Sequence, residues 1–234
     1  MSFRIDRQQL GTELRALYEY RAGPSTRVAR GDSGFLAVDC IDRGIALLAP
    51  QLTGDLLDVG CGDQPYRHYF EASCRSITAC DLDASRAGID FACPAHAIPR
   101  PDHTFDAILC SEVIEHVPDP AAVLREFARV LAPGGKLLLT APCYWPAHEL
   151  PYDYFRYPAH GLAALVERCG FRIDRFLPRG GQWAFLGQVT SHVIHRHLAR
   201  FGLQPSWNRL FQYIDRKRAN PMISLGWTVL ASKG

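Results

Sequence analysis

The chain lacks the features that mark several large classes of protein. Its eight cysteines form no CxxC pair, so buried free thiols in a reducing compartment are favoured over a zinc knuckle or a disulfide framework. No apolar run approaches the roughly 18 residues of a membrane-spanning helix, and residues 1–4 lead into a polar segment rather than a signal peptide. The net charge of +2 is too small to indicate a nucleic-acid partner. These absences predict a cytoplasmic protein with no integral membrane segment and no nucleic-acid partner.

The composition and length fit one globular domain with a substantial core, because 47% of the 234 residues are apolar and 21% are charged. From residue 55 onward, strand-like apolar runs alternate with helix-like amphipathic stretches. Strands are expected at 56–60, 77–81, 89–93, 105–110, 136–140, 171–177 and 223–232, and helices at 66–72, 119–131 and 158–169. Pro133-Gly134-Gly135 predicts a helix stop and a tight turn. This alternation is typical of an α/β, doubly wound sheet with right-handed crossovers.

Further helical segments are expected before the sheet and between its last two strands. Apolar residues recur with helical period in 5–20, up to the breaker Gly23-Pro24, and again in 34–48. We therefore expect residues 1–50 to form an N-terminal helical cap over a bound cofactor or over the sheet alone. The insert 179–221 could be a substrate lid, a dimer surface, a patch for an anionic or lipid-linked acceptor, or a solvated basic face over a buried apolar stripe.

Two of the expected strands end in residue types that suit a nucleotide-like ligand. The first strand, 56–60, runs into a glycine-bearing turn, and the second ends at Asp81 about 20 residues further on. Because the carboxyl ends of parallel strands meet at one edge of a sheet, these two ends should lie together. Glycines let a ligand approach the backbone closely, and a carboxylate can accept hydrogen bonds from ribose hydroxyls. The sequence therefore predicts an adenosine-type ligand.

Four segments together resemble the class I S-adenosylmethionine-dependent methyltransferases, in particular the type 11 methyltransferase domains. They are LLDVGCGD, CDLD, AHAIPRPDHTFDAILCSEVIEHVPDP and REFARVLAPGGKLLLTAP, in the family's order over residues 55–142. The resemblance implies a Rossmann-like seven-stranded sheet with an antiparallel last strand. It also implies a biosynthetic transferase that uses S-adenosyl-L-methionine as its cofactor and methyl donor.

The resemblance further implies which positions hold the donor. Asp81 would bind the ribose hydroxyls, Leu82 would pack on adenine, and the backbone at Ala95 would meet the adenine edge. Residues at the end of the first strand and just after it would surround the methionine part of the donor, and residues after the fourth strand would also reach the site. The donor-binding residues that the resemblance implies are Asp58, Gly60, Cys61, Gly62, Asp81, Leu82, Ala95, Ser111 and Glu112.

One glutamine and two prolines depart from related motifs and bear on the choice of cofactor. Gln64 replaces the third small residue of the family's loop, and Pro94 stands where an acid is often found beside adenine. Pro65 takes the place of the third glycine of the dinucleotide fingerprint, where it would disturb the approach of a helix to a pyrophosphate. An NAD(P)-dependent oxidoreductase is therefore the second choice for the same sheet.

The segment 143–157, which we call the acceptor loop, leaves the carboxyl end of the fifth expected strand and is dense in functional side chains. His148 is our candidate for a general base, with Glu149 or Asp153 orienting it. Arg156 could hold a carboxylate, phosphate or sugar hydroxyl of the acceptor. Alternatively, the loop folds on itself, with Arg156 paired to Asp153 and His148 making a structural hydrogen bond.

His116 follows the fourth expected strand and would either brace the adjoining loop or transfer a proton. Together with His148, Glu149 and Asp153 it offers atoms that can bind a metal, but no recognised ligand spacing is present, so no metal is expected. The sequence thus predicts methyl transfer to a small-molecule, glycan or lipid-linked acceptor, with oxygen favoured over nitrogen or carbon. A non-catalytic cofactor-binding protein is a further alternative, and a homodimer is possible.

Overall fold

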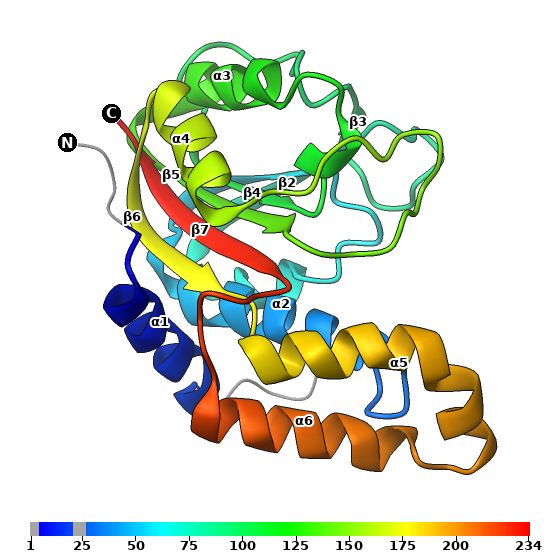
Figure 1. The fold of residues 1–234 in the computed structure, drawn as a ribbon. Coiled ribbons are helices and arrows are strands. Elements are labelled where there is room, and N and C mark those ends of the chain that lie inside the picture. Colours follow the sequence, from blue (N-terminus) through cyan, green and yellow to red (C-terminus); the bar gives the residue numbers. More distant parts are fainter. Residues whose placement is uncertain (1–4, 21–26) are drawn as a thin grey trace.

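The computed structural model describes residues 5–20 and 27–234, which fold into a central sheet covered by helices (Figure 1). The strands are β1 (Gly54–Val59), β2 (Cys74–Asp81), β3 (Phe91–Ala92), β4 (Phe105–Ser111), β5 (Leu131–Pro142), β6 (Phe171–Pro178) and β7 (Gly226–Lys233). The helices are α1 (Arg7–Glu19), α2 (Phe35–Leu48), α3 (Pro120–Val130), α4 (Ala159–Arg168), α5 (Gln182–Arg200) and α6 (Gln204–Arg218), with one-turn helices η1 (Ala49–Gln51), η2 (Arg67–Tyr69) and η3 (Ile114–His116). The start of the chain at 1–4 and the break expected at Gly23-Pro24 lie outside the described residues.

The seven strands form one sheet in the order β3-β2-β1-β4-β5-β7-β6. β7 is antiparallel to both of its neighbours, β5 and β6, and the other pairings are parallel. Val59 pairs with Cys80 on one side and with Cys110 on the other, so β1, β2 and β4 end side by side. The predicted Rossmann-like sheet with an antiparallel last strand is confirmed, and its central carboxyl edge is formed by these aligned ends.

The apolar runs of the sheet are continuous because both of its faces are buried. In β5, Leu137 and Leu139 pack with α3 and α4, whereas Leu138 packs with α1 and α2 on the opposite face. Figure 1 shows these two helix pairs on opposite sides of the sheet. Alternate side chains of a strand point to opposite faces, so each expected strand supplies both cores at once.

Four local expectations are corrected by the structure. The helix expected at 66–72 is only the single turn η2, because Tyr66 and Phe70 are already buried in the core and the chain must turn back to start β2. The edge strand expected at 89–93 is reduced to β3. The turn at 133–135 lies inside β5, where the pairing with β4 skips residues. The last strand begins at Gly226 instead of residue 223.

The insert forms the helices α5 and α6, which lie side by side and pack on the N-terminal helices (Figure 1). Buried Asp215 of α6 accepts hydrogen bonds from the backbone N–H groups of Gly181 and Trp183, at 2.7 and 2.9 Å, and thereby caps the start of α5. The same carboxylate accepts a 2.6 Å hydrogen bond from the Tyr18 hydroxyl of α1. The insert is therefore joined to the N-terminal layer by a buried polar contact.

Candidate active site

The loop after β1 turns back across the end of β2. The backbone N–H groups of Gly60 and Cys61 both donate to the carbonyl of Cys80, at 2.9 and 3.1 Å. Gly60 has a φ of +66°, and a Cβ there would lie 2.4 Å from Val113, so glycine is required. Gly62 has a φ of +51°, and nothing lies within 4 Å of where its Cβ would be. The loop therefore presents backbone with open space beside it.

Asp81 closes this loop from the end of β2. Its Oδ2 accepts a hydrogen bond from the backbone N–H of Gly62 at 2.9 Å, and its Oδ1 accepts one from Asp83 at 3.0 Å. Each carboxylate oxygen has further lone-pair capacity, which suits the hydroxyls of a ribose. The neighbouring Leu82 is 75% exposed and offers an apolar surface on which a flat ring could pack. These features fit the adenosine part of S-adenosylmethionine.

Gln64, the departure from the family's loop, is accommodated by a second bridge. Its backbone is left-handed, with a φ of +53°, and its N–H donates to the Cys61 carbonyl at 2.8 Å. Its side-chain Nε2 donates to the Gly88 carbonyl at 2.7 Å. The larger side chain thus ties the glycine loop to the segment after β2. Ala95 is half-buried and follows β3, the edge strand that pairs with β2, the strand of Asp81.

Asp58, the penultimate residue of β1, is buried with 5% of its surface exposed. Burial first, and the nearby charge of Asp81 second, together raise the pKa of its carboxyl to about 7. An ionised carboxylate at this position is therefore costly in the ligand-free protein. A cationic ligand would favour the ionised form.

Replacing Asp58 with asparagine is expected to stabilise the ligand-free protein at pH 8. The Asp58 carboxyl ionises near pH 3.8 in the unfolded chain but only near pH 7 in the folded protein, so wild-type stability falls as pH rises between these values. The shift corresponds to at most about 4 kcal/mol. Urea unfolding at pH 5, 6, 7 and 8 should show an advantage for Asp58→Asn that grows up to pH 7 and is then constant. An advantage independent of pH would contradict the raised pKa.

The ends of β4 and β5 hold a second set of polar side chains. Ser111 closes β4, and its hydroxyl lies 3.0 Å from that of Thr140 on β5. Glu112 follows with a left-handed φ of +55°, and its Oε1 accepts a 2.8 Å hydrogen bond from the Thr140 hydroxyl. The other oxygen of Glu112 forms an ion pair with Arg179, whose Nη1 lies 2.9 Å away. This set fixes the carboxylate of Glu112 at the sheet edge.

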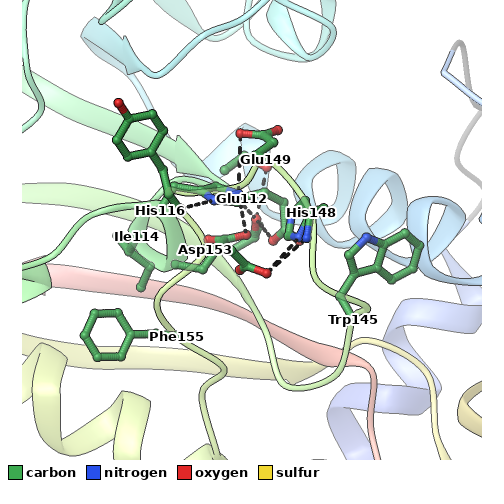
Figure 2. A network of polar contacts seen from close by, with 12 residues as sticks. Glu112, Ile114, His116, Trp145, His148, Glu149, Asp153 and Phe155 are labelled. Carbon is green, nitrogen blue, oxygen red and sulfur yellow. Dashed lines mark hydrogen bonds and ion pairs between the residues drawn. The ribbon is translucent and has the colours of Figure 1, made fainter.

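Figure 2 shows that His116 and His148 meet beside Glu112. Their rings lie 4.6 Å apart, edge to face, so η3 and the loop after β5 contact each other through imidazoles. His116 Nδ1 lies 2.8 Å from the Tyr152 carbonyl and therefore carries the hydrogen, which leaves Nε2 unprotonated in the neutral ring. That Nε2 lies 3.7 Å from the carboxylate of Glu149. His116 thus contacts the acceptor loop at two points.

His148 is oriented by Asp153. The backbone N–H of His148 donates to Asp153 Oδ2 at 3.0 Å, and its ring Nδ1 lies 3.7 Å from the same oxygen. Hydrogen bonds from Arg156 hold the pKa of Asp153 well below its usual range, so this carboxylate is ionised. Two contacts compete at Nδ1: Asp153 could accept a hydrogen from it, which would leave Nε2 free to accept a proton, whereas Arg156 Nη2, 3.4 Å away, can only donate to it.

The guanidinium of Arg156 forms hydrogen bonds with its own loop. Its guanidinium donates to both oxygens of Asp153, at 2.6 and 2.9 Å, and to the carbonyls of Trp145, Pro146 and Phe155, at 3.0, 3.1 and 2.7 Å. These bonds fold residues 145–156 into a compact turn. The structure therefore brings Arg156 onto its own loop, as the self-folded alternative expected, and not onto an open face.

Glu115 is a buried carboxyl that the sequence reasoning did not single out. It is fully buried, neither oxygen has a hydrogen-bond partner among the described residues, and burial raises its pKa well above the usual range. Within the described part of the chain, ligand atoms of Glu115, His116 and His148 all lie within 4.8 Å of one another. The fold therefore creates a group of metal-binding residue types that the spacing did not reveal. The place of Glu115 directly after the apolar pair Val113-Ile114 was a signal that could have indicated a buried acid.

Arg179 was also missed, although its signal resembles that of Asp81. It is a charge directly after the apolar end of β6, Phe176-Leu177-Pro178, and β6 runs in the same direction as β5 and so ends at the same edge of the sheet. Its position at the start of the insert concealed it, because we interpreted residues 179–221 as a separate helical unit.

A group of half-buried aromatic side chains lies where the acceptor loop meets α5. Tyr144 and Phe185 contact edge to face with ring centres 5.1 Å apart, and Trp145 contacts His192 in the same way at 4.8 Å. Buried Gln188 lies 2.9 Å from His192 Nε2. These contacts place the insert directly against the start of the acceptor loop.

A family model described as a methyltransferase domain matches residues 35–175, which is more than half of the chain. The chain belongs to the class I S-adenosylmethionine-dependent methyltransferases. The predicted enzyme class and the predicted donor are thereby confirmed, and the NAD(P)-dependent and non-catalytic alternatives are set aside. Which residues of this methyltransferase hold the donor stays a prediction.

Curated relatives of this methyltransferase are named ubiquinone biosynthesis O-methyltransferase. One, from Xanthomonas oryzae pv. oryzae (strain PXO99A), is 35% identical over 139 residues, covering 53% of this chain and 52% of the relative. Another, from Rhodopseudomonas palustris (strain BisB5), is 28% identical over 193 residues, covering 75% and 70%. The chain spans about half the length of the first of these relatives.

Solved structures share the fold at low sequence identity. The [4+2]-cyclase SpnF has a TM-score of 0.60 at 19% identity, covering 96% of this chain and 92% of its own. Phosphoethanolamine N-methyltransferase 2 of Haemonchus contortus, solved with S-adenosyl-L-methionine, has a TM-score of 0.53 at 17% identity, covering 90% and 61%. A cyclase among these neighbours shows that the fold does not determine the reaction. Among the described residues, no helix is both long and apolar enough to cross a membrane.

Proposed function

We propose that this methyltransferase transfers the methyl group to a hydroxyl oxygen on a flat, aromatic small molecule. The relatives named O-methyltransferases support oxygen as the accepting atom. The aromatic group at Tyr144, Trp145 and Phe185 supports a planar acceptor, because aromatic rings pack favourably against one another. A glycan acceptor is the alternative that the aromatic group favours less.

The observation that carries the proposal is the environment of His148. Its ring lies at the sheet edge beside Glu112 and His116, with the ionised Asp153 behind its Nδ1 (Figure 2). Such a pair can take a proton at Nε2 and stabilise the resulting imidazolium. Arg156 Nη2 donates to Nδ1 at 3.4 Å, so a base at Nε2 requires Nδ1 to turn its hydrogen toward Asp153 in place of this long contact.

The proposed reaction follows from these placements. S-adenosylmethionine supplies a methyl group made electrophilic by its sulfonium. The acceptor oxygen forms a bond to the methyl carbon as the carbon–sulfur bond breaks, and the sulfur keeps the electron pair of that bond. His148 takes the hydroxyl proton at Nε2, and Asp153 stabilises the positive ring. The acceptor loop and α5 orient the acceptor and exclude water.

Release of S-adenosylhomocysteine should depend on a phenolic acceptor. We expect the purified protein to release it with catechol, and to do so far more slowly with aniline or methyl glucoside at equal concentration. Mass spectrometry and NMR of the product should place the new methyl on oxygen. Turnover with methyl glucoside but not with catechol would overturn the aromatic acceptor, and methylation of aniline alone would overturn transfer to oxygen.

A further inference from the structure

The buried ion pair between Arg179 and Glu112 is expected to add little to the stability of the folded protein. Its side chain is 3% exposed, and among the described residues its Nε and Nη2 have no hydrogen-bond partner. A buried ion pair seldom adds stability over apolar residues of similar size, and unpaired buried donors add a further cost. A charged side chain retained at such a cost points to a role in function.

The side chain can reach Glu112 only because residue 226 is glycine. A Cβ on Gly226 would lie 1.9 Å from Nη2 of Arg179 and 2.4 Å from both Nε and Cζ. All three of its nearest neighbours belong to Arg179, and the backbone of Gly226 is not left-handed. Alanine would therefore be compatible with the backbone at this position, and its closest clashes would be with the guanidinium.

The backbone around Arg179 joins three parts of the site. Its N–H donates to the Gly226 carbonyl at 2.9 Å, and its carbonyl accepts from Leu225 at 3.3 Å. The Leu225 carbonyl in turn accepts from Cys143 and Tyr144 at the start of the acceptor loop, at 2.9 and 3.0 Å. The guanidinium is thus anchored beside the acceptor loop while its Nη1 grips the carboxylate that follows β4.

We propose that Arg179 is a positioning residue that holds the Glu112 carboxylate in place for binding of the donor, with Gly226 providing the space. Glu112 needs such support, because its backbone is left-handed and Thr140 is its only other side-chain partner among the described residues. The donor carries a sulfonium, so a fixed carboxylate at the end of β4 favours its binding. The proposal rests on the predicted role of Glu112 at the donor and not on the identity of the acceptor.

Donor affinity, measured by calorimetry with S-adenosylmethionine and no acceptor, tests this proposal independently of the methylation reaction. We expect Arg179→Met, Glu112→Gln and Gly226→Ala each to weaken binding about tenfold. The Arg179→Met/Glu112→Gln double variant should bind within about twofold of Glu112→Gln alone, because Arg179 acts through Glu112. Multiplied effects in the double variant, or unchanged affinity in Arg179→Met, would overturn the positioning role.

A second comparison separates positioning from a general loss of structure. Gly226→Ala should have no further effect in an Arg179→Ala background, where the clashing guanidinium is gone. Arg179→Lys should recover part of the affinity, since an ammonium restores the charge but not the planar geometry. Arg209→Met, at an exposed arginine of α6, is the matched control and should bind the donor normally. An equal loss from Gly226→Ala in both backgrounds would contradict the proposal.

Discussion

Replacing His148 with alanine is expected to slow methyl transfer by about 100-fold or more while leaving donor affinity nearly unchanged. A positioned general base typically contributes 10²- to 10⁴-fold to a rate. His148 lies on the acceptor loop, whereas the residues predicted to contact the donor's ribose and adenine follow β2 and β3. The rate of a single turnover with catechol and the calorimetric affinity for S-adenosylmethionine would separate the two effects.

Controls distinguish proton transfer from loss of loop structure. His160→Ala, at an exposed histidine in the first turn of α4, should retain the wild-type rate. The His148→Ala rate should recover as pH rises toward the pKa of the phenol, since an ionised acceptor needs no base. A variant that remains slow at every pH would contradict the base. Wild-type turnover that requires Mg²⁺ and is abolished by EDTA would instead make His148 a metal ligand beside Glu115 and His116.

The sheet and the donor edge could be predicted because their signals are local and repeated. Apolar runs such as 105–110 indicate a strand that is buried on both faces, and their order indicates a parallel sheet. Gly60 and Asp81 were identifiable because a left-handed turn requires the first and a strand end exposes the second. Such constraints act within a few residues and so leave a pattern in the sequence.

The acceptor side could be predicted only as a segment. Its density in His148, Asp153 and Arg156 marked the loop, but the folding of Arg156 onto three carbonyls of its own loop has no counterpart in residue spacing. The pair of Glu112 and Arg179 spans 67 positions and depends on the space left by Gly226, on a third strand. Contacts of this kind arise from tertiary packing, which periodicity does not encode.

The one-turn helix η2 is a case in which the sequence predicted more regular structure than the protein forms. Residues 66–72 carry apolar side chains at helical spacing, and the sequence therefore predicted a helix there. Burial of Tyr66 and Phe70 anchors the segment at both ends, and the N–H groups of Ser73 and Cys74 bond back to the Phe70 carbonyl, at 3.1 and 2.9 Å. Tertiary anchoring here overrides a weak local preference for helix.

Replacing Asp81 with alanine is expected to weaken binding of S-adenosylmethionine by at least about 100-fold. A hydrogen bond to a charged group is worth about 1.5–3 kcal/mol, and two ribose hydroxyls would lose such a partner. The variant also releases the Gly62 N–H, so the glycine loop loses one of its ties to β2 and keeps those from Gly60 and Cys61 to the Cys80 carbonyl. Calorimetry with both S-adenosylmethionine and S-adenosylhomocysteine should show the same loss, because the two share the adenosine.

The ribose contact and the loop tie can be separated by changing the ligand. Wild-type protein should prefer S-adenosylhomocysteine over its 2′-deoxy analogue, and Asp81→Ala should bind both with equal, weak affinity. Asp83→Ala, two residues further on in the exposed turn, should keep the preference. Among the described residues, the carboxylate that it removes contacts Ser85 and Arg86. If Asp81→Ala retained the preference for the 2′-hydroxyl, the carboxylate would act only on Gly62, and the ribose would have to be bound elsewhere along the edge.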